Sequence, residues 1–185
     1  MTQKIIGFSG NLDRPSKTRT LVQTVVQSAA TRFDAIGAVF DLADFGPSFP
    51  LARRASDLEG PAKAALEVIL SADALVVGSP VYKGSYTGLF KHLIDLIDPE
   101  ALRGKPVLLT ATGGGDRHAL MVEHQLRPLF GFFEAQTLPT ALYASDRDFT
   151  DGQPTAPAFL DRLERAVEQF SPWFVRRAVS VARSA

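Results

Sequence analysis

Hydroxyl and cationic side chains crowd one short segment near the start of the chain. The segment reads SGNLDRPSKTRT and precedes a run with helical periodicity. Backbone N–H groups at the start of a helix bind anions, and the helix dipole favours negative charge there. The hydroxyls of Ser16 and Thr18, with the guanidinium of Arg14 or Arg19, could therefore close around a phosphate. The alternative is that Ser16 only caps the helix and that the cations are solvated.

A second segment, GSPVYKGSYTG, spans residues 78–88 between two apolar runs. Pro80 favours an extended backbone before it, and Gly84 and Gly88 allow the chain to pass close to a ligand. Backbone N–H groups here could bind the edge of a flat ring, and Tyr82 could pack on its face. The alternative is that Tyr82 and Tyr86 are half-buried and that the segment merely starts a helix.

A third segment, Thr112-Gly113-Gly114-Gly115-Asp116, places consecutive glycines after another apolar run. Such a run is typical of a close approach to a ligand or of a sharp turn, because ordering several glycines costs backbone entropy. A plain turn is the alternative for this segment alone. Three segments of this kind in one chain favour a shared binding site.

Other kinds of site are poorly supported. The first segment lacks the Walker spacing, and Gly7 and Gly10 do not complete a dinucleotide fingerprint, although Asp41 could imitate its ribose-binding acid. His118 and His124 are six residues apart on a predicted helix and point to different faces, so no metal site is predicted. There is no cysteine and no distinctive acid, base or nucleophile. The pattern favours a protein whose cofactor performs the chemistry.

The composition is that of an ordinary soluble domain, with 45% apolar and 22% charged residues. Lys plus Arg and Asp plus Glu each number 20, which gives no support for nucleic-acid binding and argues against an acidic electron carrier. No apolar stretch is long enough to span a membrane, and the first residues do not form a signal peptide. We expect a cytoplasmic protein with a single domain over residues 1–185.

Hydrophobic periodicity predicts strands that alternate with helices five times. Strands are expected at 5–8, 35–41, 74–79, 105–110 and 137–143; helices from 18 and at 61–71, 89–97, 118–133 and 158–179; and long loops at 42–60 and 144–157. This pattern indicates an α/β fold, a flavodoxin-like three-layer sandwich around a five-stranded parallel sheet of order 2-1-3-4-5. In that order the first, third and fourth strands are central, and the three segments above follow them.

Two predicted helices have unusual features. Pro128 lies inside the 118–133 helix and cannot donate a hydrogen bond to the carbonyl of His124, so a kink or a π-bulge is expected there. The 89–97 helix is apolar on more than one face, which predicts burial at a subunit contact.

The motifs GSPVYKGSYTGLFKHLIDLI, ATGGG and HALMVEHQLRPLF resemble those of the NAD(P)H-dependent FMN reductases of bacterial two-component sulfonate monooxygenases. The likeness extends from Lys4 to about residue 175. It implies a flavodoxin-like fold, FMN with NADH or NADPH, and a homotetramer assembled from homodimers. The first segment departs from the family's compact G-S-x-R-x-x-S pattern.

The resemblance also implies roles for particular residues, carried over position by position. The FMN phosphate would be held by Ser9, Arg14, Ser16, Thr18 and Arg19. The isoalloxazine would be held by Pro80, Val81, Tyr82 and Lys83, and its other edge by Thr112, Gly113 and Gly114. His124 falls on the residue that the family inserts in a π-helix at the tetramer interface, and a histidine there resembles the methanesulfonate-type members.

The expected function is a reductase that takes hydride from NADH or NADPH and passes it through N5 of FMN. The reduced flavin would then leave for an FMN-dependent monooxygenase. One alternative is an enzyme that retains FMN and reduces quinones, azo dyes or chromate; another is a non-enzymatic electron carrier of the flavodoxin type. The sequence does not decide between NADH and NADPH, and Arg117 and Arg53 are the cations considered for a 2′-phosphate.

Overall fold

The fold is built on one parallel sheet, and the computed structural model describes residues 2–174. Its long strands are β1 (Lys4–Ser9), β2 (Ile36–Asp41), β3 (Ala74–Pro80) and β4 (Pro106–Gly113). They lie in the order β2-β1-β3-β4, and two short strands, β5 (Gln136–Thr137) and β6 (Leu142–Ser145), both pair with β4 at the far edge. This is the doubly wound, flavodoxin-like order that the sequence predicts.

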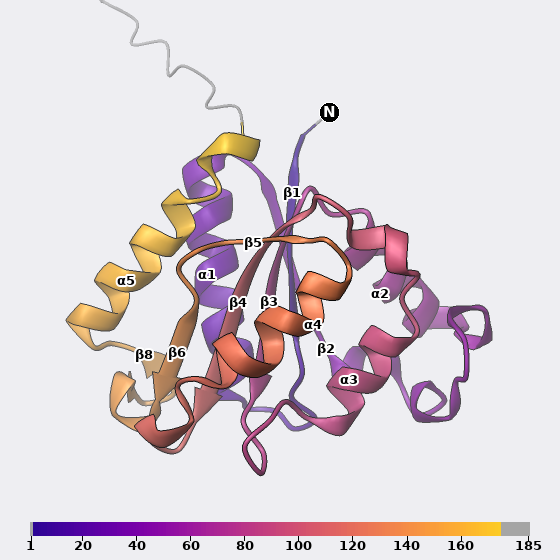
Figure 1. Cartoon of the computed structure of the whole chain (residues 1–185), viewed down its shortest axis with the longest axis horizontal. Coiled ribbons are helices and arrows are strands. Elements are labelled where there is room, and N and C mark those ends of the chain that lie inside the picture. The colour runs from indigo at the N-terminus through magenta and orange to yellow at the C-terminus, as the bar shows by residue number, and fades with distance from the viewer. Residues whose placement is uncertain (1, 175–185) are drawn as a thin grey trace, which may run out of the picture.

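Helices cover both faces of this sheet, which gives three layers (Figure 1). One face carries α1 (Lys17–Phe33) and α5 (Pro157–Glu168); the other carries α2 (Gly60–Leu70), α3 (Gly88–Asp95) and α4 (Arg127–Phe132). Strand β3 shows why both faces need a cover, because its side chains alternate between two apolar cores. Leu75 and Val77 belong to the core under α2, α3 and α4, and Ala74 and Val76 to the core under α1 and α5.

Helix α1 lies close to the sheet for two reasons. Its apolar residues recur at helical spacing and form one face, and this face packs against Gly7 of β1, which has no side chain. A Cβ added at Gly7 of β1 would meet Val22 at 2.5 Å and Val26 at 3.0 Å. The helix ends at Phe33 and is capped by Asp34, whose φ of 52° is left-handed. The position of α1 matters for the site because its first turn lies at the carboxyl edge of the sheet, at the bottom of Figure 1.

The fifth strand differs from the prediction of one strand over 137–143. It is split into β5 and β6 around residues 138–141, although both pieces pair with β4. Pro139 lies in the gap, and a proline cannot donate a hydrogen bond to a sheet ladder. Gln169 compensates, since its side chain accepts from the Thr140 amide at 2.9 Å and donates to the Thr140 hydroxyl at 2.7 Å.

The regions predicted as long loops contain local structure. Residues 42–60 include three short 3₁₀ turns, at Leu42–Phe45, Phe49–Leu51 and Ala55–Asp57. Residues 144–157 include a small antiparallel hairpin of β7 (Phe149–Thr150) and β8 (Gln153–Pro154). The prediction of one polar loop over 144–157 was therefore wrong, because a two-residue turn with positive φ at Asp151 and Gly152 closes a hairpin too short to show alternation.

The last helix is shorter than the predicted 158–179. Helix α5 ends at Glu168, and a separate 3₁₀ turn follows at Ser171–Trp173. Pro172 explains the break, since it has no N–H to donate to the carbonyl of Glu168, four residues back. The remainder of the predicted helix, from residue 175, lies outside the described residues.

The predicted 118–133 helix is also divided, at the place where Pro128 led us to expect an irregularity. A 3₁₀ turn at Asp116–His118 is followed by a π-helix over Val122–Leu126, and α4 begins at Arg127. The amide of Arg127 donates to the carbonyl of Val122, five residues back. The predicted π-bulge around His124 is thus present.

Helix α3 buries its apolar residues in the chain's own core. Phe90, Leu93 and Ile94 are 0%, 1% and 3% exposed, and Leu89 packs against the same cluster. The apolar character of residues 89–97 therefore needs no subunit contact to explain it.

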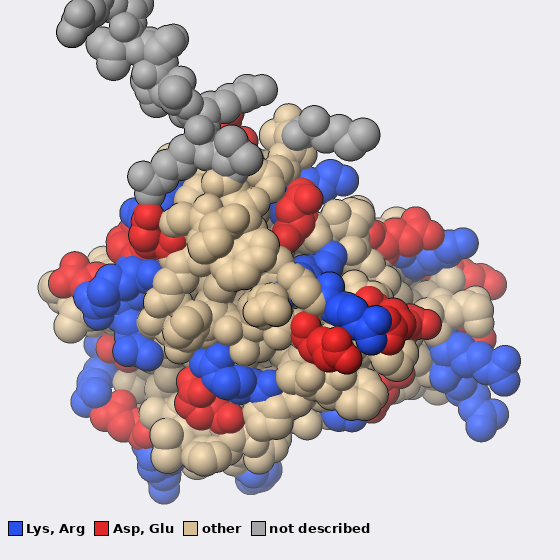
Figure 2. All heavy atoms as spheres, turned by 45° about the horizontal axis from the view of Figure 1, so that its top comes forward, with Lys and Arg blue, Asp and Glu red and all other residues tan. Residues whose placement is uncertain are grey.

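The surface of the molecule is mixed in charge. Acidic and basic side chains are interspersed over the face seen in Figure 2. Within the described residues, no helix combines the length and apolarity needed to cross a bilayer.

Candidate functional site

The three segments singled out in the sequence meet at one edge of the sheet. Parallel pairing places Ser9 of β1 beside Gly78 of β3, and Pro80 of β3 beside Thr112 of β4. The loops after these strands therefore start side by side, and the amides of Gly10 and Val81 link them by donating to Gly78 and Thr112 carbonyls at 2.7 and 2.8 Å. In an open α/β sheet, ligands bind at this edge.

The first loop joins β1 to the N-terminus of α1. Ser16 is the N-cap, and its hydroxyl accepts from the Arg19 amide at 3.3 Å. The Ser9 hydroxyl is fully buried and donates to Asn11 at 2.6 Å. Thr18 is also buried, so Ser16 is the predicted hydroxyl nearest to solvent in this loop.

The two arginines of this loop converge on carboxylates. Arg14 binds Asp41 in a bidentate manner, with Nε and Nη2 at 2.7 and 2.6 Å from its oxygens, and Nη2 also reaches Asp44 at 2.7 Å. Arg19 lies 3.2 Å from the same Asp41 carboxylate. Both guanidiniums therefore share one end of β2, where Asp41 is fully buried.

Asp41 stays ionised because the arginines outweigh its burial. Burial alone would raise the pKa of this carboxyl, but hydrogen bonds from Arg14 and the charges of Arg19 and Arg14 lower the pKa below its usual 3.8. The same contacts raise the pKa of Arg14. The sequence reading treated Asp41 only as a possible ribose-binding acid. The ion pairs could have been predicted, because Asp41 ends a strand next to the one that leads into a loop with two arginines.

The second loop forms a tight turn. Tyr82 and Ser85 exchange backbone hydrogen bonds of 2.9 and 3.2 Å, and Lys83 and Gly84 between them have positive φ, as a type I′ turn requires. Tyr82 is 59% exposed, which leaves its ring free to pack on a ligand. Thr87 caps α3 and donates to the Gly10 carbonyl at 2.9 Å, so the second loop is also fixed to the first.

The third loop is supported from behind by Tyr143 of β6. The Tyr143 hydroxyl donates to the Gly115 carbonyl, and a Cβ added at Gly113 would collide with this hydroxyl. Burial and the nearby carboxylates of Asp116, Asp146 and Asp148 raise the pKa of Tyr143, so it remains a donor at neutral pH. A Cβ at Gly115 would meet nothing within 4 Å. Sequence reasoning missed Tyr143, whose strand is distant in the chain.

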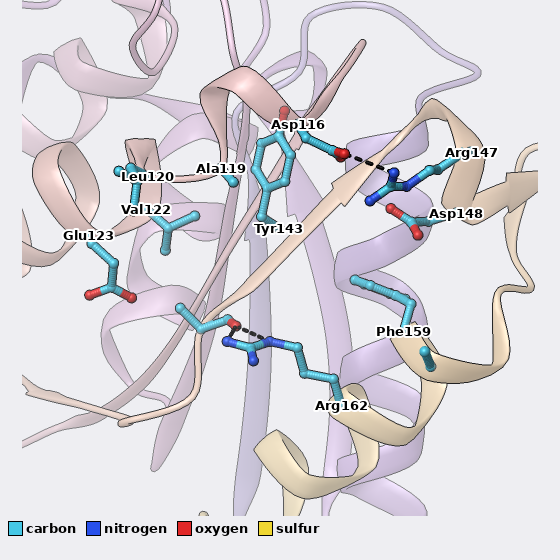
Figure 3. Close-up of a pocket in the computed structure, with 12 residues that line it drawn as sticks. Asp116, Ala119, Leu120, Val122, Glu123, Tyr143, Arg147, Asp148, Phe159 and Arg162 are labelled. Atoms are coloured by element: carbon cyan, nitrogen blue, oxygen red, sulfur yellow. Dashed lines mark hydrogen bonds and ion pairs between the residues drawn. The ribbon is translucent and has the colours of Figure 1, made fainter.

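A hollow of about 620 Å³ lies next to the third loop, between the π-helix and the start of α5. Figure 3 shows its lining, which includes Tyr143 but none of the predicted site residues. Arg147 pairs with Asp116 at 2.8 Å, and Arg162 donates twice to the Ala141 carbonyl. Both of these cations thus have hydrogen-bond partners within the lining of the hollow.

The π-helix is fixed to the rest of the fold by Arg127. This side chain donates to Glu123 within the π-helix and to Thr137 and Leu138 beyond α4, the latter two at 3.0 Å. His124 itself is exposed and lies outside the loop site. Within the described part of the chain, no three His, Asp or Glu side chains gather as a metal site would require.

The residues present suit a flavin mononucleotide. A helix N-terminus with a hydroxyl cap and two arginines suits its phosphate. A glycine-containing turn with an exposed tyrosine, and a glycine loop that leaves its backbone uncovered, suit a flat heteroaromatic ring with polar edges. The fold and this edge together define a flavin-binding protein of the flavodoxin-like class.

Comparison with known proteins identifies the family. Residues 3–150 match the family model described as NADPH-dependent FMN reductase, so the chain belongs to that family. It is an oxidoreductase that uses FMN and a nicotinamide nucleotide, as the resemblance in its sequence implied.

Several relatives support this assignment. The NADH-dependent FMN reductase SfnF of Pseudomonas putida is 42% identical over 97% of each chain. An FMN reductase (NADPH) of Pseudomonas aeruginosa is 44% identical over 95% of this chain and 94% of its own. The apo crystal structure of the NADH:FMN oxidoreductase EmoB superposes with a TM-score of 0.84, at 26% identity over 96% of this chain and 92% of that one.

Proposed function

We propose that this protein reduces FMN with a nicotinamide nucleotide and releases the reduced flavin to a separate FMN-dependent monooxygenase that cleaves sulfonates or sulfones. The observation that carries the proposal is the meeting of three loops at the carboxyl ends of β1, β3 and β4, each with donors suited to a different part of FMN. The name of the SfnF relative, an NADH-dependent FMN reductase, supports the same activity.

The phosphate would lie at the N-terminus of α1. Ser16 and the first amides of the helix supply neutral donors, and Arg14 and Arg19 supply charged ones. Ser9 and Thr18 were also predicted as phosphate ligands. Both hydroxyls are buried and bonded within the protein, so we assign them the supporting role of shaping the loop.

The isoalloxazine would lie between the second and third loops. Pro80, Val81, Tyr82 and Lys83 would form one wall, and Thr112, Gly113 and Gly114 would form the other; the pairing of Pro80 with Thr112 supports this by bringing the two loops together. FMN, when bound, supplies the hydride chemistry that no side chain of the protein can perform. The protein contributes the orientation of the two reactants and a surface from which water is displaced.

One set of assays tests the proposal. The purified protein is examined for a yellow colour, and NADH and NADPH oxidation is followed with and without free FMN. A colourless protein whose oxidation rate saturates with added FMN supports the proposal. A protein that retains FMN and reduces quinone without added flavin would identify the retained-cofactor enzyme, and one that oxidises neither nucleotide would be an electron carrier.

We also propose that the protein self-associates through the segment containing the π-helix. Leu120 and Phe132 are 64% and 69% exposed, and His124 and Pro128 lie exposed between them at spacings of four residues. A stripe with two large exposed apolar side chains suits a second copy of the chain, which carries the same stripe. The family resemblance, with His124 at the inserted position, supports this face.

A further inference from the structure

Asp41 carries a buried charge, and no step of the proposed reductase chemistry uses it. Its side chain is fully buried, and its carboxylate accepts hydrogen bonds from Arg14, Arg19, Asn11 and the Ala43 amide. A buried carboxylate is costly unless it is paired and hydrogen-bonded. The number of its partners indicates that its role is to hold them.

The side chains that bind Asp41 all belong to the region predicted to bind phosphate. Asn11 and Arg14 lie in the first loop, and Arg19 lies in the first turn of α1. Asp44 closes the arrangement, since it accepts from the Asp41 amide at 2.8 Å and from Arg14 at 2.7 Å. The end of β2 thus fixes a loop that begins at β1.

Both arginines keep donors that these contacts do not use. The interactions described for Arg14 involve Nε and Nη2, and those for Arg19 involve Nη1. Their side chains are 44% and 26% exposed, so neither guanidinium is closed off from a ligand. A guanidinium held in this way presents its remaining donors in a fixed direction: Nη1 of Arg14, and Nε with Nη2 of Arg19.

We infer that Asp41 is a positioning residue for the flavin phosphate, and that it gives the site its preference for FMN over riboflavin. This inference rests on the proposed function. Two carboxylates offset two guanidiniums, so the pocket attracts an anion weakly by net charge alone. Recognition then depends on correctly oriented donors, and Asp41 sets the orientation of both.

The inference is tested by flavin fluorescence titration, which measures the Kd of FMN and of riboflavin without turnover. The variants are Asp41→Asn, Arg14→Gln and their combination, with Asp95→Asn, in a surface pair with Lys91, as the control. We expect Asp41→Asn to weaken FMN binding about tenfold or more while changing riboflavin binding less than about twofold. The effect should be smaller in the Arg14→Gln background, because the two residues act as a unit.

Three outcomes would overturn the inference. Tighter FMN binding by Asp41→Asn would show that the carboxylate competes with phosphate, unchanged FMN binding would show no role, and equal losses for both flavins would show a merely structural effect. If Asp41→Asn does not fold, Arg14→Lys retains the charge without the bidentate pair, and it must show the same FMN-selective loss. Failure of the proposed function is separate, because it would appear as absent NADH and NADPH oxidation by the wild-type protein.

Discussion

The hydroxyl oxygens of Thr18 and Thr112 lie 2.6 Å apart, with both residues buried. Thr18 belongs to the first turn of α1, and Thr112 lies near the end of β4, two strands away from β1. The bond joins the predicted phosphate loop to the predicted ring-binding loop behind the ligand site. The sequence treated both residues as FMN contacts, whereas the structure pairs each hydroxyl with the other.

Replacing either threonine by valine should leave one buried hydroxyl without a partner. We expect Thr18→Val or Thr112→Val to lower the free energy of unfolding by about 1–3 kcal/mol, and the double variant to lose much less than the sum. Urea unfolding without FMN measures this, with Thr24→Val in the same helix as the control. Additive losses would show that the hydroxyls do not depend on each other.

Substitutions at Ser16 separate its two roles. Ser16→Ala should destabilise the protein by about 1 kcal/mol through loss of the helix cap, whereas Ser16→Gly should cost only a few tenths. If the hydroxyl binds phosphate, both variants should lose about 1.5–3 kcal/mol of FMN binding, and adding Arg14→Ala should deepen the loss. If the FMN affinity of Ser16→Gly is unchanged, Ser16 caps the helix but does not bind the phosphate.

Gly113 lies against the hydroxyl of Tyr143. A Cβ at residue 113 would collide with the Tyr143 hydroxyl, so Gly113→Ala should displace the third loop and lower both stability and FMN affinity. Tyr143→Phe removes that hydroxyl, and the pair Gly113→Ala with Tyr143→Phe should recover part of the loss. Thermal unfolding and FMN titration measure both effects. Gly115→Ala is the control, because its Cβ would enter open space.

The ion pairs of Asp41 predict a particular dependence of stability on acid. Burial raises the pKa of Asp41, but the Arg14 hydrogen bond and the charges of Arg19 and Arg14 bring it below 3.8. A carboxyl with a lower pKa in the folded state stabilises the protein fully above its unfolded pKa and loses that contribution as the pH falls through the folded value.

Asp41→Asn should therefore be less stable than the wild type at neutral pH, and the difference should narrow below about pH 4. Urea unfolding of both proteins over this range measures it. A difference that is the same at neutral and acidic pH would show that ionisation of Asp41 contributes nothing to folding.

The self-association surface is tested by introducing a charged side chain at Leu120 or Phe132. Leu120→Glu and Phe132→Glu should each shift the protein toward smaller species in sedimentation velocity, because a charge in an apolar contact is costly to desolvate. Leu51→Glu is the control, since Leu51 is 83% exposed on another part of the chain. An unchanged sedimentation profile in both variants, with the wild type associated, would place the contact elsewhere.

The sequence alone determined the layers and the edge at which the site lies. The strand periods depend on local chemistry, which is why β1, β2 and β3 were predicted to within one residue of their ends. Strand β4 continues to Gly113, three residues beyond its predicted end, because Ala111, Thr112 and Gly113 still pair with β6. Pro128 likewise revealed the π-helix, since a missing N–H is a property of the residue itself. The split in the last strand at Pro139 had the same kind of signal but was outweighed by the apolar pattern around it.

Only the tertiary structure decided which side chains share their hydrogen bonds. Asp41 and Arg14 are 27 residues apart, and Thr18 and Thr112 are 94 apart, so nothing local connects them. Sheet register brings the ends of β2, β1, β3 and β4 together, and burial then forces each polar group to find a partner there. For this reason the sequence named the residues of the site, while the fold divided them into those that face a ligand and those that hold the others in place.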